Sequence, residues 1–103
     1  MKTYEVVVEA TAMEELESAY RWIAQNAPED AVRWYNRLMD ELETLQIFPM
    51  RCPKAPEATS FDRDIRQMIY GNYRVLFTLE QHTVHIIHVR HAARLPIRPP
   101  QET

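Results

Sequence analysis

Apolar positions recur with two different periods along the chain, and these periods predict the order of the secondary structure elements. A valine-rich segment without glycine or proline opens the chain and predicts a short strand. Two stretches with apolar residues three and four apart follow and predict helices. Three β-rich runs then complete the pattern. The predicted strands are residues 3–9, 64–70, 73–80 and 83–90, and the predicted helices are residues 11–26 and 28–48.

The starts of the two helices carry their own signals. Thr11 and Glu14 have the spacing of a capping box, in which both side chains bind free backbone N–H groups at a helix start. Pro28 suits the first turn of the second helix, where its missing N–H would have no partner. The helices are therefore expected to form an antiparallel hairpin. Its apolar stripes need a sheet to cover them.

Proline and glycine mark the connecting segments. Residues 49–62 contain three prolines among polar residues and predict a loop without helix or strand. The pairs at 71–72 and 81–82 predict tight turns that join the last three strands into a meander. The proline-rich tail, residues 96–103, is expected to trail along the surface. We therefore expect a single α+β domain, residues 1–95, with a two-helix hairpin on an antiparallel four-stranded sheet.

The last predicted strand contains one irregularity. Val84 and Ile86 share one parity, whereas Val89 continues the apolar set at the opposite one. Either a bulge near Ile87-His88 interrupts the alternation, or the strand is buried on both faces, and the sequence leaves both open. A bulge would re-aim the side chains beside it, as bulges often do next to functional sites.

Composition and charge exclude several classes of protein. The single cysteine cannot form an internal disulfide, the N-terminus does not resemble a secretory signal, and no apolar run approaches the roughly 20 residues of a membrane span. A cytoplasmic protein without a membrane partner is expected. The net charge of −3 argues against general attraction to phosphate. However, residues 63–98 hold six arginines against two acids, which predicts a local basic face.

Neither a metal nor a cofactor is expected. His82, His85, His88 and His91 are three residues apart, and on a strand such residues point to opposite faces. Cys52 has no partner cysteine, so we expect it to be a bystander. One glycine cannot build a phosphate-binding loop.

A basic cluster remains as the candidate site. Guanidinium groups bind carboxylate or phosphate through a planar fork, and histidine can transfer protons near neutral pH. The alternative is a solvated sheet face whose arginines pair with acids of the helices, and composition leaves both open. The cluster consists of Arg66, Arg74, His88, Arg90, His91 and Arg94.

The order of elements and several short motifs resemble the RelE/ParE toxin superfamily over residues 3–95. The most telling motif is Tyr73-Arg74-Val75-Leu76-Phe77. The other motifs are Ala31-Val32-Arg33, Phe48-Pro49, Ile65-Arg66-Gln67-Met68 and Val84-x-Ile86-x-x-Val89-x-His91-x-x-Arg94. The resemblance implies the toxin of a type II toxin–antitoxin system, of the kind that stabilises plasmids.

Two branches of the superfamily imply different activities. RelE-like members are ribosome-dependent mRNA endonucleases, with lysines on the strand before the Tyr-Arg motif and a tyrosine after the last strand. Here that strand carries Arg66 and Gln67, and no tyrosine follows Tyr73. The departures favour the ParE branch, whose members poison DNA gyrase and are not enzymes. For a gyrase poison the expected target-binding residues are Arg66, Arg74, Arg90, His91 and Arg94. For the alternative, a nuclease, the expected catalytic residues are Arg74, His88, His91 and Arg94.

The resemblance also implies a cognate antitoxin. Antitoxins of this superfamily wrap the toxin with an amphipathic helix in an apolar groove and often an added strand. Trp22 and Trp34 are the candidates for that groove, although both could instead cap the core. No sequence-specific DNA binding by the toxin alone is expected. A third reading is a non-toxic binding module, which a test of toxicity would distinguish.

Overall fold

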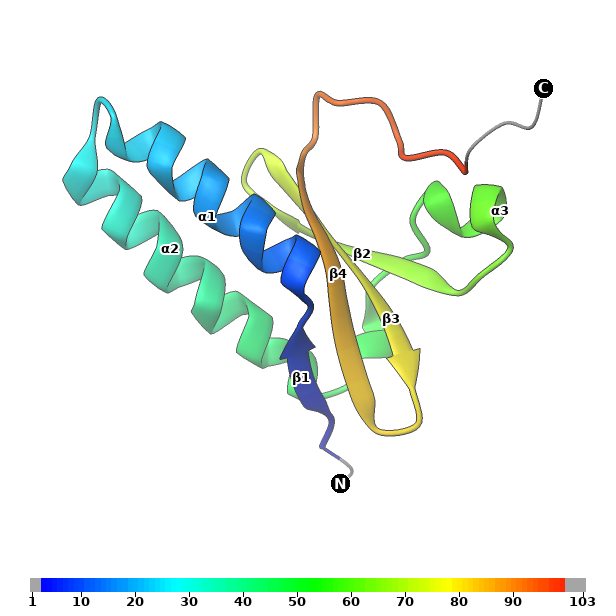
Figure 1. Cartoon of the computed structure of the whole chain (residues 1–103). Coiled ribbons are helices and arrows are strands. Elements are labelled where there is room, and N and C mark those ends of the chain that lie inside the picture. The colour runs from blue at the N-terminus through cyan, green and yellow to red at the C-terminus, as the bar shows by residue number, and fades with distance from the viewer. Residues whose placement is uncertain (1–2, 100–103) are drawn as a thin grey trace.

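The first strand, β1 (Glu5–Val8), leads directly into α1 (Ala10–Ala24), and α2 (Pro28–Glu43) returns beside it (Figure 1). The computed structural model describes residues 3–99. Two 3-10 turns, η1 (Thr44–Gln46) and η2 (Pro49–Arg51), and the short helix α3 (Glu57–Phe61) lead into the strands β2 (Ile65–Tyr70), β3 (Tyr73–Glu80) and β4 (Thr83–His91). The predicted hairpin and meander are confirmed. The helices end earlier than expected, because a 3-10 turn completes the second one.

The four strands lie in the order β1-β4-β3-β2. The meander is antiparallel, but β1 pairs in parallel with β4, from Glu5 opposite Thr83 to Val8 opposite Ile86. The sheet is therefore mixed, and the expectation of a wholly antiparallel sheet was wrong for β1. Tight turns fix the direction of neighbouring strands. The direction of β1 depends instead on how the helical hairpin returns the chain, which no local pattern encodes.

The first helix begins without the predicted capping box. Its N-cap is Glu9, no side chain caps it, and Thr11 lies inside the helix. The reason is that Glu9 still belongs to the sheet edge: its backbone N–H donates to the carbonyl of Ile86, and its carboxylate lies 2.7 Å from Nδ1 of His85. The chain thus passes from strand to helix with no loop in which Thr11 could act as a cap.

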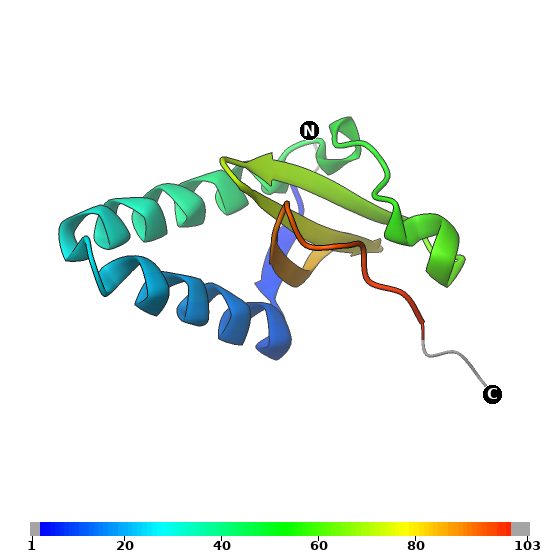
Figure 2. The ribbon, with the colours of Figure 1, turned by 90° about the horizontal axis from the view of Figure 1, so that it is seen from above.

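The prediction of a loop without elements in residues 49–62 was also wrong. Pro49 opens η2, and Pro56 is the N-cap of α3. Proline lacks an N–H and has a fixed φ, so it suits the first turn of a helix even where it excludes longer elements. Of these short elements, α3 packs with Ala58 and Phe61 on the face of the sheet that the hairpin leaves open. Figure 2 shows α3 at the end of the sheet away from the hairpin.

Of the two alternatives for the last strand, the structure has the bulge. The register shifts so that Leu76 and Phe77, adjacent on β3, stand opposite His88 and Ile86 on β4. Ile87 is the extra residue. Because the bulge leaves Ile87 outside the alternation, Val89 faces the core, where it is 4% exposed.

The main core lies between the helical hairpin and one face of the sheet. The hairpin buries Ala12, Leu16, Leu38, Leu42 and Leu45, and the sheet buries Met68, Val75, Phe77, Val84, Ile86 and Val89. A smaller cluster on the opposite face contains Ala55, Ile65 and Leu76. The expected tail begins after the end of β4. Residues 96–99 form neither helix nor strand, and residues 100–103 lie outside the described residues.

Candidate functional site

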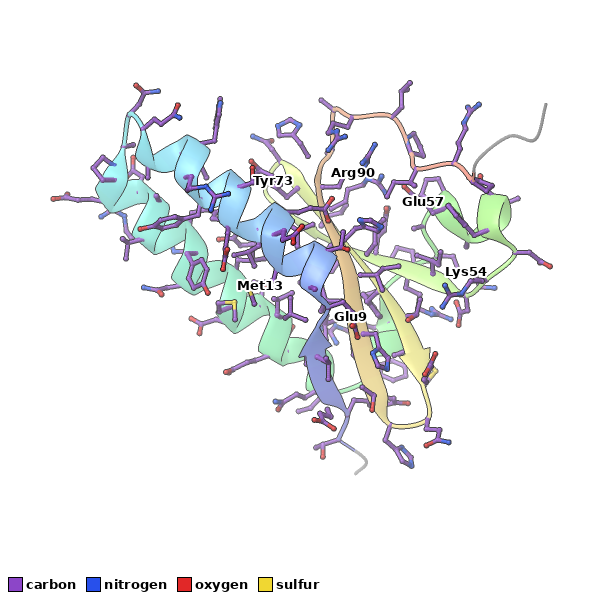
Figure 3. All side chains as sticks on the ribbon, viewed as in Figure 1. Glu9, Met13, Lys54, Glu57, Tyr73 and Arg90 are labelled. Atoms are coloured by element: carbon purple, nitrogen blue, oxygen red, sulfur yellow. The ribbon has the colours of Figure 1, made fainter. Side chains whose placement is uncertain are left out.

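The alternation of side chains along the strands divides the predicted basic cluster between the two faces of the sheet. Arg74 stands opposite Arg90 on the face away from the hairpin, which we call the open face. His91 stands opposite Tyr73, on the face that packs against the hairpin. Figure 3 shows Arg90 and Glu57 near the C-terminal segment, with Tyr73 toward the hairpin. The cluster is therefore two separate arrangements.

Arg74 lies in the interior and forms a two-point ion pair. Its Nη1 donates to Oε1 of Glu57 at 3.0 Å, and its Nη2 donates to Oε2 at 2.8 Å. Nη1 also donates to Gln67, and the residue is only 7% exposed. The guanidinium that the resemblance assigns to a target or a phosphate is thus held by Glu57.

Glu57 is the buried anion of this site. Burial by itself would raise its pKa, but hydrogen bonds from the Arg74 guanidinium and from backbone N–H groups outweigh that effect and lower the pKa to about 2. One of those backbone groups is the N–H of Ile97, 3.0 Å from Oε2. Sequence reasoning missed Glu57, because a lone acid directly after Pro56 gives no sign of its distant partner.

Arg66 is also directed inward. Its Nη1 donates to the carbonyls of Met50 at 3.1 Å and Cys52 at 2.8 Å, and Asp64 lies 3.3 Å from its Nε. It therefore holds the segment after α2 against the edge strand β2. Cys52 is buried beside it, and burial raises the pKa of its thiol.

Arg90 braces the turn that follows β4. Its Nε and Nη2 donate to the carbonyl of Leu95 at 3.2 and 2.8 Å. Burial and the nearby cations Arg94 and Arg74 lower its pKa. Of the five predicted target-binding residues, three thus have their guanidinium groups engaged within the protein.

Two histidines of β4, His85 and His88, pair with acids of the first helix and its N-cap. Nδ1 of His88 lies 3.0 Å from Oε1 of Glu15, which also accepts the N–H of Val89 at 3.1 Å. His85 pairs with Glu9 in the same way. A carboxylate at Nδ1 orients an imidazole ring, so His88 presents its other nitrogen in a defined direction. It lines a hollow of about 300 Å³ on the open face.

The end of β4 carries the predicted residues that are exposed. His91 and Arg94 are exposed, and Trp22 on α1 is 69% exposed. Nδ1 of His91 accepts the N–H of Ala93 at 3.1 Å, so the neutral ring would carry its proton on Nε2.

Two adjoining hollows, of about 380 and 520 Å³, share Trp22, Tyr73 and His91 in their walls. We call them together the aromatic groove. The ring centres of Trp34 and Tyr73, and of Tyr73 and His91, are each 5.3 Å apart with edge-on geometry. Tyr70 joins the row and donates its hydroxyl to the carbonyl of Trp34 at 2.9 Å. Burial raises the pKa of both tyrosines, so they act here as neutral rings.

The groove brings together residues that the sequence assigned to different partners. Trp22 and Trp34, predicted for the antitoxin, lie beside His91 and Arg94, predicted for the target. Trp34 packs against the core, whereas Trp22 does not. The tyrosines at 70 and 73 were missed as site residues. The signal available was their placement on both sides of the Gly71-Asn72 turn, where a hairpin pairs them.

Residues 3–99 contain neither a metal-binding cluster nor a membrane-spanning helix. No group of three or more His, Cys, Asp or Glu side chains in this part of the chain could hold a metal ion. No helix in the same residues is long and apolar enough to cross a membrane.

Comparison with known proteins identifies the family. The model of the family described as the ParE toxin of the type II toxin-antitoxin system, parDE, matches residues 6–96. A solved structure described as the chromosomal ParDE TA system from P. aeruginosa is similar at a TM-score of 0.73 and 14% identity, covering 86% of this chain and 96% of the other. That likeness shows the shared fold, while no curated protein sequence matches. Because the family model spans most of the chain and agrees with the predicted branch, this protein belongs to the ParE toxin family of type II toxin–antitoxin systems.

Proposed function

We propose that the protein arrests growth by inhibiting DNA gyrase through the exposed end of β4, and that it is not an enzyme. The observation that carries this proposal is the state of Arg74. A nuclease of the RelE type needs this arginine free to bind a phosphate, whereas here its guanidinium is bound on two sides by Glu57. His91 and Arg94 are exposed and remain available to a large partner. A target that acts on chromosomal DNA would make the cytoplasm the place of action.

We further propose that an antitoxin neutralises the toxin by filling the aromatic groove. An exposed tryptophan next to a row of packed aromatic rings is typical of an interaction hot spot, since it gives a partner apolar area at low cost in side-chain entropy. Because Trp22, His91 and Arg94 line adjoining hollows, one bound segment would cover the target-binding residues as well. If a plasmid encodes such a pair, daughter cells that lose the plasmid would stop growing once the antitoxin is gone, which would maintain the plasmid in the population.

One observation favours the alternative, an mRNA endonuclease. The Glu15 carboxylate orients His88, and an oriented imidazole is the usual form of a general base. In this reading His88 would activate a ribose 2′-hydroxyl. Arg74 would then have to leave Glu57 to bind the phosphate. A non-toxic binding module is the third reading, and growth after induced expression separates it from the other two.

The test of the target uses a matched pair of arginine variants. With Arg94→Ala, inhibition of gyrase should weaken more than tenfold, because removing a charged group from a buried interface costs about 2–5 kcal/mol. Arg98→Ala, which also removes an exposed arginine beyond β4, should leave inhibition unchanged. Accumulation of cleaved DNA by purified gyrase measures the effect. Intact gyrase activity at high toxin concentration, with ribosome-dependent cuts that vanish in His88→Ala, would establish the nuclease instead.

The test of the groove uses Trp22. Co-expression of the antitoxin should rescue cells from the wild-type toxin but not from Trp22→Ala, provided that this variant stays toxic. Val32→Ala is the control, because Val32 is an exposed apolar residue that lines neither hollow of the groove. Equal rescue of both variants would place the antitoxin elsewhere on the surface.

A further inference from the structure

The turn that follows β4 is tied to the sheet by its backbone up to Arg94. The N–H of Ala92 donates to the carbonyl of Asn72 at 2.7 Å, which joins this turn to the turn between β2 and β3. The N–H of Ala93 donates to Nδ1 of His91 at 3.1 Å, and the N–H of Arg94 donates to the carbonyl of His91 at 3.1 Å. The turn belongs to no helix or strand, so these bonds fix the backbone in place of a regular element.

The backbone is also held directly after Arg94. Nε and Nη2 of Arg90 donate to the carbonyl of Leu95 at 3.2 and 2.8 Å, so two N–H groups of one planar guanidinium meet this carbonyl. Two residues later, the N–H of Ile97 donates to Oε2 of Glu57 at 3.0 Å. Arg94 itself is exposed and lines one hollow of the aromatic groove. An exposed cation is thus carried by a backbone that is fixed on both sides.

A contribution to stability does not by itself explain an arginine at position 90. Arg90 stands directly opposite Arg74 on β3, and like charges opposite each other on neighbouring strands are destabilising. Burial lowers the pKa of Arg90, and the positive charges of Arg94 and Arg74 lower it further, while carboxylates offset this effect only in part. The carbonyl that Arg90 binds belongs to Leu95, whose side chain is 80% exposed. An uncharged residue would avoid the repulsion, so what this arginine adds is a fixed backbone beside Arg94.

We propose that Arg90 is a positioning residue for Arg94 in the inhibition of gyrase. Its guanidinium fixes the carbonyl of Leu95, and through this backbone it holds Arg94 at the edge of the aromatic groove. A segment that is ordered in advance loses less conformational entropy when a partner binds. Arg90 itself does not contact gyrase, in contrast to the direct contact expected from the sequence. This role rests on the function proposed above, in which Arg94 binds the target.

The test measures inhibition of purified gyrase by the full-length protein in a double-mutant cycle of Arg90 and Arg94. Arg90→Met keeps a long side chain but removes every N–H donor, and it should weaken inhibition at least about fivefold. In the Arg94→Ala background the same substitution should change inhibition by less than about twofold, because no cation remains to be positioned. Two independent contacts with gyrase would instead give losses that multiply. Arg90→Gln removes the same pair of donors with a polar side chain and serves if Arg90→Met does not fold.

Arg51→Met is the matched control. Arg51 braces a different turn in the same manner, since its Nη1 donates to the carbonyls of Ile47 at 2.7 Å and Phe48 at 3.2 Å. Its loss should leave gyrase inhibition unchanged, and equal weakening by Arg51→Met would attribute the effect of Arg90→Met to lost stability. A second measurement needs no gyrase. Arg90→Met should speed the hydrogen exchange of the Arg94 amide, because the turn opens more often, whereas Arg51→Met should not.

The possible failures are distinguishable. Wild-type inhibition by Arg94→Ala would contradict the function proposed above, and the positioning role would fall with it. Weak inhibition by Arg94→Ala together with wild-type inhibition by Arg90→Met would overturn the positioning role alone. Losses that multiply in the double variant would also overturn it and make Arg90 a direct contact of gyrase. Unchanged exchange of the Arg94 amide in Arg90→Met would overturn it as well.

Discussion

The two faces of the sheet are covered by different chemistry. The hairpin face buries aliphatic and aromatic side chains, among them Phe77 and Ile86, under α1 and α2. The open face buries an ion pair, Arg74 with Glu57, and seals it with a short helix and one isoleucine. The hairpin face is stabilised by the apolar area that it buries, which requires no particular direction of contact. The open face depends on an ion pair whose two charged groups must meet in one geometry.

This difference between the two faces explains why only some of the predicted arginines are available to a partner. On the open face, an arginine that points inward is needed to neutralise Glu57 and is not available to a partner. Beyond the end of β4 there is no such demand, and Arg94 stays exposed. Position relative to the two faces, and not the residue type, separates structural from available cations.

The largest loss of stability is expected from a substitution on the hairpin face. Phe77 is fully buried, so Phe77→Ala should lower the free energy of unfolding by about 3–5 kcal/mol through lost burial and a new cavity. Urea denaturation measures the loss. Ile69→Ala, at a strand position 59% exposed, should change stability by less than about 0.5 kcal/mol. Similar losses in both variants would mean that the sheet faces are not distinguished by burial.

The next largest loss of stability is expected when the ion pair of the open face is broken. Arg74→Leu leaves a buried carboxylate without its cation, and breaking a buried pair in this way costs about 3–5 kcal/mol. Since the N–H of Ile97 still binds Glu57, we expect the lower end, about 3 kcal/mol. The double variant Glu57→Leu/Arg74→Leu should recover most of the loss, because no unpaired charge remains. A double variant as unstable as the single one would show that the arginine acts through packing alone.

Acid should weaken the open face selectively. The pKa of Glu57 is about 2 in the folded protein, below its ordinary value of 4.5. The unfolded chain therefore takes up the proton first as the pH falls, and the stabilisation present above pH 4.5 is lost toward pH 2. Between pH 6 and pH 3 this group should cost about 2 kcal/mol of unfolding free energy. Urea titrations of the wild type and Glu57→Gln should converge as the pH falls, and parallel curves would contradict the assignment.

The smallest change in stability is expected for a groove residue, and a core residue on the same helix provides the comparison. Trp22→Ala should change stability by less than about 0.5 kcal/mol, because the indole is 69% exposed. On the same helix Leu16→Ala should cost about 2–5 kcal/mol, since Leu16 is fully buried. Thermal or urea unfolding of the two variants provides the measurement. A large loss in Trp22→Ala would make this tryptophan a part of the core.

Much of the fold could be predicted from the sequence because it depends on local periodicity and turns. The strand limits at Tyr73 and Glu80 follow from the turns beside them, and the slip between Ile86 and Val89 left a bulge as one of two explanations. The parallel pairing of β1 and the short helix α3 could not be predicted in this way. Their positions depend on contacts between residues more than 15 apart in the chain, and a local sequence pattern contains no information about such contacts.

The candidate site was predictable only in part. His91 and Arg94 lie next to Trp22, as a shared surface requires, but no pattern placed these residues side by side. Glu57 could not be found, because its importance comes from Arg74, which is 17 residues away in the chain. Buried charge pairs of this kind are visible only once the chain is folded.

The extra residue at Ile87 acts as a phase shift in the last strand. Side chains before it keep one parity, and those after it keep the other, so Val89 and His91 face the hairpin side while His88 and Arg90 face the open side. Deletion of Ile87 would leave these residues on their present faces, because the bulge already takes the extra residue out of the alternation. Loss of the bulge with Ile87 retained would instead turn His88 and Arg90 toward the hairpin and His91 toward the open side. The chemistry of the groove therefore depends on the bulge itself, and a relative that lacks the extra residue would still present the counterpart of His91 to the groove.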